Sequence, residues 1–224
     1  EGATVIVSDL EQNAVDKVVD EIKANNGDAI GMKLDVSSDE DRKRAVKSIV
    51  QEFGCLDILI NNAGIALETD IDSQNYSDVW AKSIGVLLTA QAMLIRECLP
   101  MLKRSDGGRI VNIASTEGLG ATKGISPYTA AKTGVIGLTR SLAVELGPDN
   151  ITVNCICPGP IRTAMTDNIP EDAKVVFARR RVALKRYADP EEVAHGTLNF
   201  VLPASQYITG THLAIDGGLT IKNA

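Results

Sequence analysis

The stretch "RIVNIASTEGLGATKGISPYTAAKTGVIGLTRSLAVELGPDNITVNCI" (residues 109–156) indicates the fold of this chain. Its two ends, 109–113 and 151–156, are short runs rich in Val and Ile, as in strands that are buried on both faces. Between them, residues 127–146 carry apolar side chains at helical spacing. A strand, a long helix and a second strand in this order are typical of a parallel sheet covered by helices.

The same alternation runs along the rest of the sequence. Strands are expected at 4–8, 30–34, 57–60, 109–113, 151–156 and 212–215. Helices are expected at 11–25, 38–53, 73–103, 127–146 and 190–202, with the third one broken. No repeat or linker interrupts this pattern, so we expect one α/β domain over residues 1–224. Its fold is expected to be a Rossmann-like, doubly wound parallel sheet with helices on both faces.

One segment departs from the alternation. Residues 160–188 are charged and contain no strand pattern, which is unusual for a connection inside a compact domain. We expect a substrate lid at 164–185, or an exposed pair of short helices.

The composition excludes several classes of function. The chain has 224 residues, 44% of them hydrophobic, and a net charge of −6 with scattered basic residues. Such a chain can bury a large core, but it lacks the basic patch that binds nucleic acid or an anionic membrane. No apolar run approaches the roughly 18 residues of a membrane span, and no leader opens the chain. We therefore expect a soluble protein whose partner is a small molecule.

The titratable sulfur and imidazole groups give no metal site. The four cysteines lack zinc-ligand spacing, and Cys155 and Cys157 lie on one face of a buried strand, where a disulfide closes poorly. His195 and His212 are isolated, so no metal is expected. A reducing cytoplasm is the simplest location.

Polar residues gather where the expected strands end. These residues are Asp9, Asp35, Asn61, Asn62, Ser115 and the Pro158-Gly159 pair. The carboxyl ends of the strands in an open parallel sheet line the crevice where ligands bind, so this distribution predicts a site there.

A tyrosine and a lysine are the candidate proton carriers. Ser126 and Pro127 begin a helix well, and they place Tyr128 and Lys132 four positions apart on one face. A free phenol has a pKa of about 10, so we expect Lys132 to make Tyr128 acidic enough for proton transfer. An isolated pair of this kind is most often a solvated one. Ser115, thirteen residues earlier, favours the catalytic interpretation because its hydroxyl can bind a substrate oxygen.

In their order along the chain, NNAG (61–64), Ser115, YTAAK (128–132) and PGPIRT (158–163) resemble the short-chain dehydrogenase/reductase family. The resemblance implies an NAD-dependent oxidoreductase for a secondary alcohol or its ketone, assembled as a homotetramer or homodimer. It implies Tyr128 as general acid/base, Lys132 as its electrostatic partner and Ser115 as the holder of the substrate oxygen. The implied cofactor-binding residues are Asp9, Asp35, Val36, Asn62, Ala63, Gly64, Tyr128, Lys132, Pro158, Gly159, Ile161 and Thr163.

The choice of cofactor depends on Asp9. A carboxylate after this strand accepts hydrogen bonds from a ribose diol and repels a 2′-phosphate. Residues 10–13 offer no cation for such a phosphate, so NAD is expected rather than NADP.

The sequence departs from the family pattern in two places. The glycine-rich phosphate loop, with the first strand and helix, is expected upstream of residue 1, in a native protein longer than this sequence. The family also has an Asn in the long helix before the catalytic serine. The stretch "VWAKSIGVLL" (79–88) offers Ser83 or Lys82 at that position, and we favour Ser83 because a second ammonium beside Lys132 is costly.

Two alternative functions remain open at this stage. One is a catalytically silent cofactor-binding or regulatory protein of the same fold, and the other is a 3-oxoacyl-thioester reductase. We expect Glu117, Leu119 and residues 164–185 to line the substrate pocket. The run Arg179-Arg180-Arg181 is either a solvated helix face or a binding site for a carboxylate or phosphate.

Overall fold

The computed structural model describes residues 2–223 and divides between Gly54 and Cys55 into two compact units. The organisation of residues 1–224 as a single domain stays a prediction.

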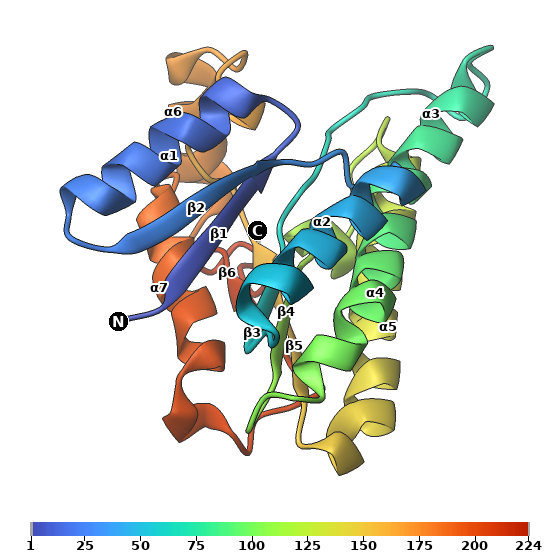
Figure 1. Cartoon of the computed structure of the whole chain (residues 1–224). Helices are drawn as coiled ribbons and strands as arrows, with labels where there is room; N and C mark the ends of the chain where they lie inside the picture. Colours follow the sequence, from blue (N-terminus) through green and yellow to red (C-terminus); the bar gives the residue numbers. More distant parts are fainter. Residues whose placement is uncertain (1, 224) are drawn as a thin grey trace. The chain divides into compact units, whose positions relative to one another are not determined.

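The first unit is a pair of parallel strands with two helices (Figure 1). Its elements are β1 (Thr4–Asp9), α1 (Gln12–Ala24), β2 (Asp28–Lys33) and α2 (Asp39–Phe53). β1 pairs with β2 in parallel, with Thr4 opposite Asp28. Val15 and Val19 of α1 are buried with Ala29 of β2, which holds the helix on the sheet.

Local signals in the sequence set the ends of α2. The Ser38 hydroxyl accepts a hydrogen bond from the Asp41 N–H at 3.2 Å, which satisfies one of the free donors of the first turn. The helix ends at Gly54, whose φ of +74° is a conformation that favours glycine.

The second unit is built on a four-stranded parallel sheet in the order β3-β4-β5-β6. The strands are β3 (Ile58–Asn61), β4 (Arg109–Ile113), β5 (Thr152–Pro158) and β6 (His212–Ile215). Almost every residue of the central strands β4 and β5 is buried, which explains their continuous apolar sequence.

Helices cover both faces of this sheet. On one face α4 (Ala90–Leu102) contacts β3 and β4, and α5 (Ser126–Leu146) contacts β4 and β5. On the other face α7 (Pro190–Val201) packs on β4, β5 and β6 (Figure 1). The doubly wound parallel architecture expected from the sequence is therefore confirmed.

The helix expected to break is continuous. α3 (Tyr76–Ile84) passes through a π-helical turn (Gly85–Thr89) into α4, and Pro100 is accommodated near the end. This 27-residue helix, Tyr76–Leu102, is long and apolar enough to cross a membrane, so the expectation of no such run was wrong. Its contacts with β3, β4 and α5 are those of a core helix in a globular unit.

The charged segment 160–188 forms a loop whose two ends are tied together. Ile161 and Ala188 form an isolated parallel bridge, and the Ala188 N–H donates to the Pro160 carbonyl at 3.0 Å. Between them lie a short 3₁₀ turn (Ala164–Thr166) and the helix α6 (Glu171–Arg181), the pair of short helices that was one of the two expectations. The lid role of 164–185 stays a prediction.

Candidate active site

Ser115 lies directly beyond the carboxyl end of β4. The Ala114 N–H donates to the Ile156 carbonyl at 2.8 Å, which continues the β4–β5 ladder up to this point. The Ser115 Oγ accepts a hydrogen bond from the Glu117 N–H at 3.1 Å and so caps a 3₁₀ turn (Thr116–Gly118). The Ser115 hydroxyl also forms a hydrogen bond with the Tyr128 phenol, which lowers the pKa of the phenol. A substrate oxygen can take the place of the phenol as the acceptor of the Ser115 hydroxyl.

Lys132 lies one helical turn beyond Tyr128 on α5. The Lys132 side chain is buried, with 3% of its surface exposed, and its Nζ donates to the Ile113 carbonyl at 2.7 Å. The same Nζ is 5.6 Å from the centroid of the Tyr128 ring. The hydrogen bond to β4 fixes the ammonium beside the phenol, so the structure brings the two residues together as the sequence predicted.

The protonation of this pair depends on burial. Burial raises the pKa of Tyr128, the Ser115 hydroxyl acts in the opposite direction, and the Glu117 charge raises it further. Burial also lowers the pKa of Lys132 to about 8. Desolvation of the phenol is the largest cause of the raised pKa, and the role of Lys132 as its electrostatic partner stays a prediction. At pH 7 the pair is a neutral phenol beside an ammonium ion.

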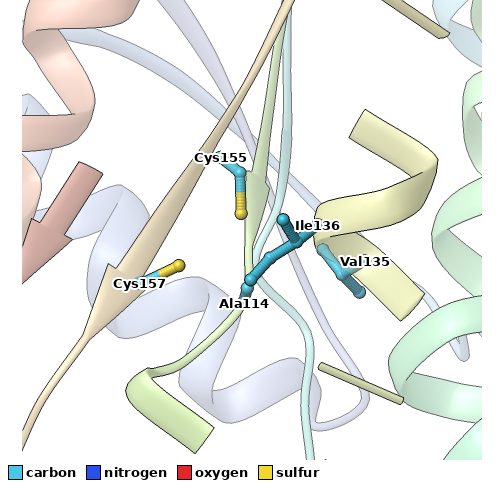
Figure 2. Close-up of a cluster of buried hydrophobic side chains, with 5 residues drawn as sticks. All are labelled: Ala114, Val135, Ile136, Cys155 and Cys157. Carbon is cyan, nitrogen blue, oxygen red and sulfur yellow. The ribbon is translucent and has the colours of Figure 1, made fainter. Parts of the chain in front are cut away.

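An apolar cluster of β5 and α5 contains two cysteines that act on the charge of Lys132. Figure 2 shows Cys155 and Cys157 of β5, both projecting toward Ala114, with side chains of α5 on the other side. The cysteines are free thiols and are fully buried, as expected from their spacing on one strand face. Burial lowers the pKa of Lys132, whereas Cys155 and Cys157 act in the opposite direction. The Ile113 carbonyl supplies the polar contact that the buried ammonium requires.

A buried network of amide side chains holds the strand ends in register. The Asn61 Nδ2 donates to the Asn112 Oδ1 at 2.8 Å, and the Asn112 Nδ2 donates to the Thr139 hydroxyl of α5 at 3.0 Å. The sequence analysis did not identify Asn112 or Thr139. An Asn inside an otherwise apolar strand is the signal that would have found them, since Asn is depleted in strands.

The turn after Ser115 approaches α5 so closely that Gly118 has no room for a side chain. A Cβ at Gly118 would lie 2.8 Å from the Lys132 carbonyl oxygen and 2.9 Å from the Ile136 Cδ1. The turn after Ser115 can pack this closely on α5 only with glycine at this position.

Replacing Gly118 with Ala is therefore expected to move the turn away from α5. We expect a loss of about 1–3 kcal/mol in the free energy of unfolding and a clear loss of activity. Chemical denaturation and initial rates measure the two effects. Gly120→Ala is the control, because the nearest atom to its Cβ would be 3.8 Å away. Equal stability of the two variants would contradict this interpretation.

The loop after β3 fits a cofactor that lies along the strand ends. Asn62, Ala63 and Gly64 are exposed, and a Cβ at Gly64 would come within 3.4 Å of Leu87. The bare backbone at Gly64 suits close approach by a flat ligand.

The end of β5 offers a similar surface. A Cβ at Gly159 would lie 2.7 Å from the Asp216 Cα, so only glycine fits between the two strand ends. Pro158 is half-buried and Thr163 is exposed, whereas the Ile161 side chain is buried. Ile161 can therefore reach a ligand only through its backbone.

The remaining cofactor candidates belong to the first unit. Asp9 is exposed, and its Oδ1 accepts the Glu11 N–H at 2.9 Å while its Oδ2 accepts no hydrogen bond from residues 2–223. Asp35 accepts the hydroxyl and the N–H of Ser37 at 2.6 and 2.8 Å, and these hydrogen bonds lower its pKa. Val36 is half-buried. Asp9 thus presents a free carboxylate oxygen of the kind that binds a ribose hydroxyl.

Ser83 and Lys82 face opposite environments. Ser83 is 1% exposed and its hydroxyl has no hydrogen-bond partner among residues 2–223, whereas Lys82 is exposed. Of these two residues, only Ser83 lies on the buried side of the long helix, which packs against α5.

A cavity of about 860 Å³ begins at the residues that follow Ser115. Thr116, Glu117 and Leu119 line one side, and α6 lines another. Glu117 and Leu119 were expected here, as were residues of 164–185. The cavity lies within the second unit and has room for a small organic substrate. In residues 2–223 no group of three or more His, Cys, Asp or Glu side chains is placed to hold a metal ion.

Comparisons with known proteins agree with this geometry. A family model described as enoyl-(acyl carrier protein) reductase matches residues 1–220. The 3-oxoacyl-(acyl-carrier-protein) reductase FabG of Thermotoga maritima is 37% identical over 221 residues, which cover 99% of this chain and 89% of that protein. The chain belongs to the short-chain dehydrogenase/reductase family.

Other relatives of this short-chain dehydrogenase/reductase are named for different activities. The meso-2,3-butanediol dehydrogenase of Serratia marcescens is 35% identical, over 100% of this chain and 87% of that protein. The cyclohexanol dehydrogenase of Acinetobacter sp. is 36% identical, over 99% and 87%. This short-chain dehydrogenase/reductase is accordingly an oxidoreductase.

A solved structure supports the fold of this short-chain dehydrogenase/reductase. A gluconate 5-dehydrogenase from Burkholderia cenocepacia, in complex with NADP and tartrate, superposes with a TM-score of 0.91 at 23% sequence identity. The match covers 99% of this chain and 87% of that one.

Proposed function

We propose that this protein transfers a hydride between NAD and a secondary alcohol or its ketone. Tyr128 is the general acid/base, Lys132 supports it electrostatically and Ser115 holds the substrate oxygen. The observation that carries the proposal is the buried Lys132 ammonium, fixed at 2.7 Å on the end of β4 and 5.6 Å from the Tyr128 ring.

The protonation states suit reduction of a ketone near neutral pH. The neutral phenol of Tyr128 donates its proton to the carbonyl oxygen, which the Ser115 hydroxyl holds by a hydrogen bond. The phenolate that forms is stabilised by the Lys132 ammonium, which is fully in place because β4 fixes it. In the oxidative direction the same groups take the alcohol proton back. The cofactor, when bound, supplies or accepts the hydride.

The choice of NAD is supported by Asp9. Its free carboxylate oxygen can accept a hydrogen bond from a ribose hydroxyl, and its charge repels a 2′-phosphate. Asp35, Val36, Asn62, Ala63, Gly64, Pro158, Gly159, Ile161 and Thr163 complete the proposed cofactor site. Lys132 also contacts the nicotinamide ribose in this proposal.

Ser83 is proposed to take the place of the family Asn in proton relay. A buried hydroxyl without a protein partner is able to bind an ordered water, which such a relay requires.

A homotetramer or homodimer in the cytoplasm is proposed on weaker physical grounds. Val144 of α5, Trp80 of α3 and Leu213 of β6 leave 82%, 41% and 38% of their surfaces exposed. These are the elements through which the family assembles, and large exposed apolar side chains favour association.

The second candidate function is 3-oxoacyl-thioester reduction. The 37% identical relative from Thermotoga maritima carries this activity in its name, as does a 36% identical one from Synechocystis. Asp9 argues against the NADP that such reductases generally use.

One assay tests the proposal and separates the two candidates. The protein is mixed with NAD or NADP and a panel of secondary alcohols, polyols and hydroxyacyl thioesters, and absorbance at 340 nm is followed. We expect turnover of at least one secondary alcohol, with kcat/KM higher for NAD than for NADP. Turnover confined to thioesters with NADP would establish the second candidate, and no turnover with any compound would contradict both.

A further inference from the structure

One face of α6 lines the cavity that begins at Thr116 and Glu117. The lining residues recur at i, i+1, i+4, i+5, i+8 and i+9, as one face of a helix requires: Asp172, Ala173, Val176, Phe177, Arg180 and Arg181. Acidic, apolar and basic residues follow one another along about 12 Å of helix between Ala173 and Arg181. The cavity therefore has an apolar middle and a basic end.

The two arginines at that end have no ion-pair partner within residues 2–223. The residues four positions earlier are Val176 and Phe177, so no carboxylate of the helix can pair with either guanidinium. Within residues 2–223 neither Arg180 nor Arg181 forms an ion pair or a side-chain hydrogen bond, and both are exposed. Two unpaired guanidinium groups at the end of a cavity are suited to bind an anion.

A lysine side chain binds the backbone carbonyls at the C-terminal end of α6. The Lys222 Nζ donates to the Arg180 carbonyl at 2.7 Å and lies 3.4 Å from the Arg179 carbonyl. This ammonium offsets the partial negative charge at the end of the helix, which would otherwise oppose anion binding. The guanidinium groups thus remain free to face a ligand.

The side chains in the apolar middle of the cavity are partly exposed, and one of them packs against a neighbouring ring. Val176 and Phe177 leave 55% and 40% of their surfaces exposed, and the Phe177 ring packs edge-on against Tyr187 with 6.1 Å between centroids. Leu119 and Leu219 line the same cavity. An apolar chain between the reacting carbon and the anion would cover this surface.

The acids of the cavity lie away from the arginines in sequence and in their contacts. Glu117 follows Ser115, and its carboxylate accepts the hydroxyls of Thr122 and Thr129 at 2.8 and 3.3 Å. Asp172 is in the first turn of α6, two turns before Arg180. Within residues 2–223 neither acid forms an ion pair with Arg180 or Arg181.

We propose that the substrate is a ketone or secondary alcohol that carries a carboxylate or phosphate on an apolar chain. Arg180 and Arg181 bind the anion while Ser115 and Tyr128 bind the oxygen at the reacting carbon. This proposal rests on the oxidoreductase function proposed above.

The test uses matched acids and esters. Dissociation constants in the presence of NAD are measured by calorimetry for 6-oxoheptanoate and its methyl ester. A second arm compares acetoacetyl-CoA with the phosphate-free acetoacetyl-N-acetylcysteamine. Each pair presents the same ketone with and without the anion, and the two arms distinguish carboxylate from phosphate. Values of kcat/KM for reduction with NADH are measured in parallel.

We expect the anionic member of at least one pair to bind about tenfold or more tightly, as for a charge-assisted hydrogen bond. The preference should fall to near unity in the double variant Arg180→Gln/Arg181→Gln, with binding of the neutral member unchanged. Arg179→Gln is the matched control, because Arg179 is exposed on the same helix but does not line the cavity. It should keep the full preference.

Equal binding of the anionic and neutral members by the wild type in both arms would overturn the proposal. An equal loss of preference in Arg179→Gln and in the double variant would also overturn it. If the oxidoreductase function proposed above is wrong, no compound will be reduced. The ratio of the dissociation constants of the neutral and anionic members still tests the anion site in that case.

Discussion

Replacing Tyr128 with Phe is expected to lower kcat for ketone reduction at least about 10²-fold, the lower range for loss of general acid catalysis. Phe keeps the ring and its contact with Lys132 but removes the proton that Tyr128 transfers to the carbonyl oxygen. The dissociation constant of the cofactor should change little. Initial rates at saturating NADH and a calorimetric titration with NADH measure the two quantities.

Tyr207→Phe is the matched control for this variant. Tyr207 is 99% exposed and outside the cavity, so the same change should leave kcat unaltered. A Tyr128→Phe enzyme as active as this control would remove Tyr128 from the mechanism.

Replacing Lys132 with Met is expected to lower kcat about 10²- to 10³-fold, the range seen when a preorganised electrostatic group is removed. The phenolate that forms on Tyr128 would lose its neighbouring positive charge. Met nearly fills the same volume, and it removes a buried ammonium whose pKa burial lowers to about 8. We therefore expect the thermal midpoint to remain close to that of the wild type.

Lys47→Met provides the comparison for a general loss of a lysine, because Lys47 is exposed on α2. Differential scanning calorimetry and initial rates separate folding from catalysis. If Lys132→Met lost activity only in proportion to a lost folded fraction, the electrostatic role of Lys132 would be contradicted.

The alternation of strands and helices could be predicted because its signals are local. The apolar runs of β4 and β5 reflect strands that are buried on both faces, and the Ser126-Pro127 pair marks the start of α5. These elements were located within two residues of their observed bounds. The π-helical turn at Gly85–Thr89 was missed because it depends on the packing of one helix against α5, which no short stretch of sequence encodes.

The residues of the candidate site could be proposed from the sequence, but their protonation states could not. Ser115, Tyr128 and Lys132 follow from their places at a strand end and on one helical turn. The pKa of Tyr128 depends on how deeply the phenol is buried, and the hydrogen bond from Lys132 to Ile113 depends on the approach of α5 to β4. Gly118 and Asn112 acquire their roles only through contacts with distant segments.

The pH dependence of ketone reduction tests the proton-transfer pair most directly. Lys132 is charged below its folded pKa of about 8 and loses the ammonium above it. Values of kcat/KM for the ketone, measured with NADH from pH 6 to 10, should therefore be level near neutrality and fall with an apparent pKa close to 8. A rate that stays level up to pH 10 would contradict the role assigned to the Lys132 ammonium.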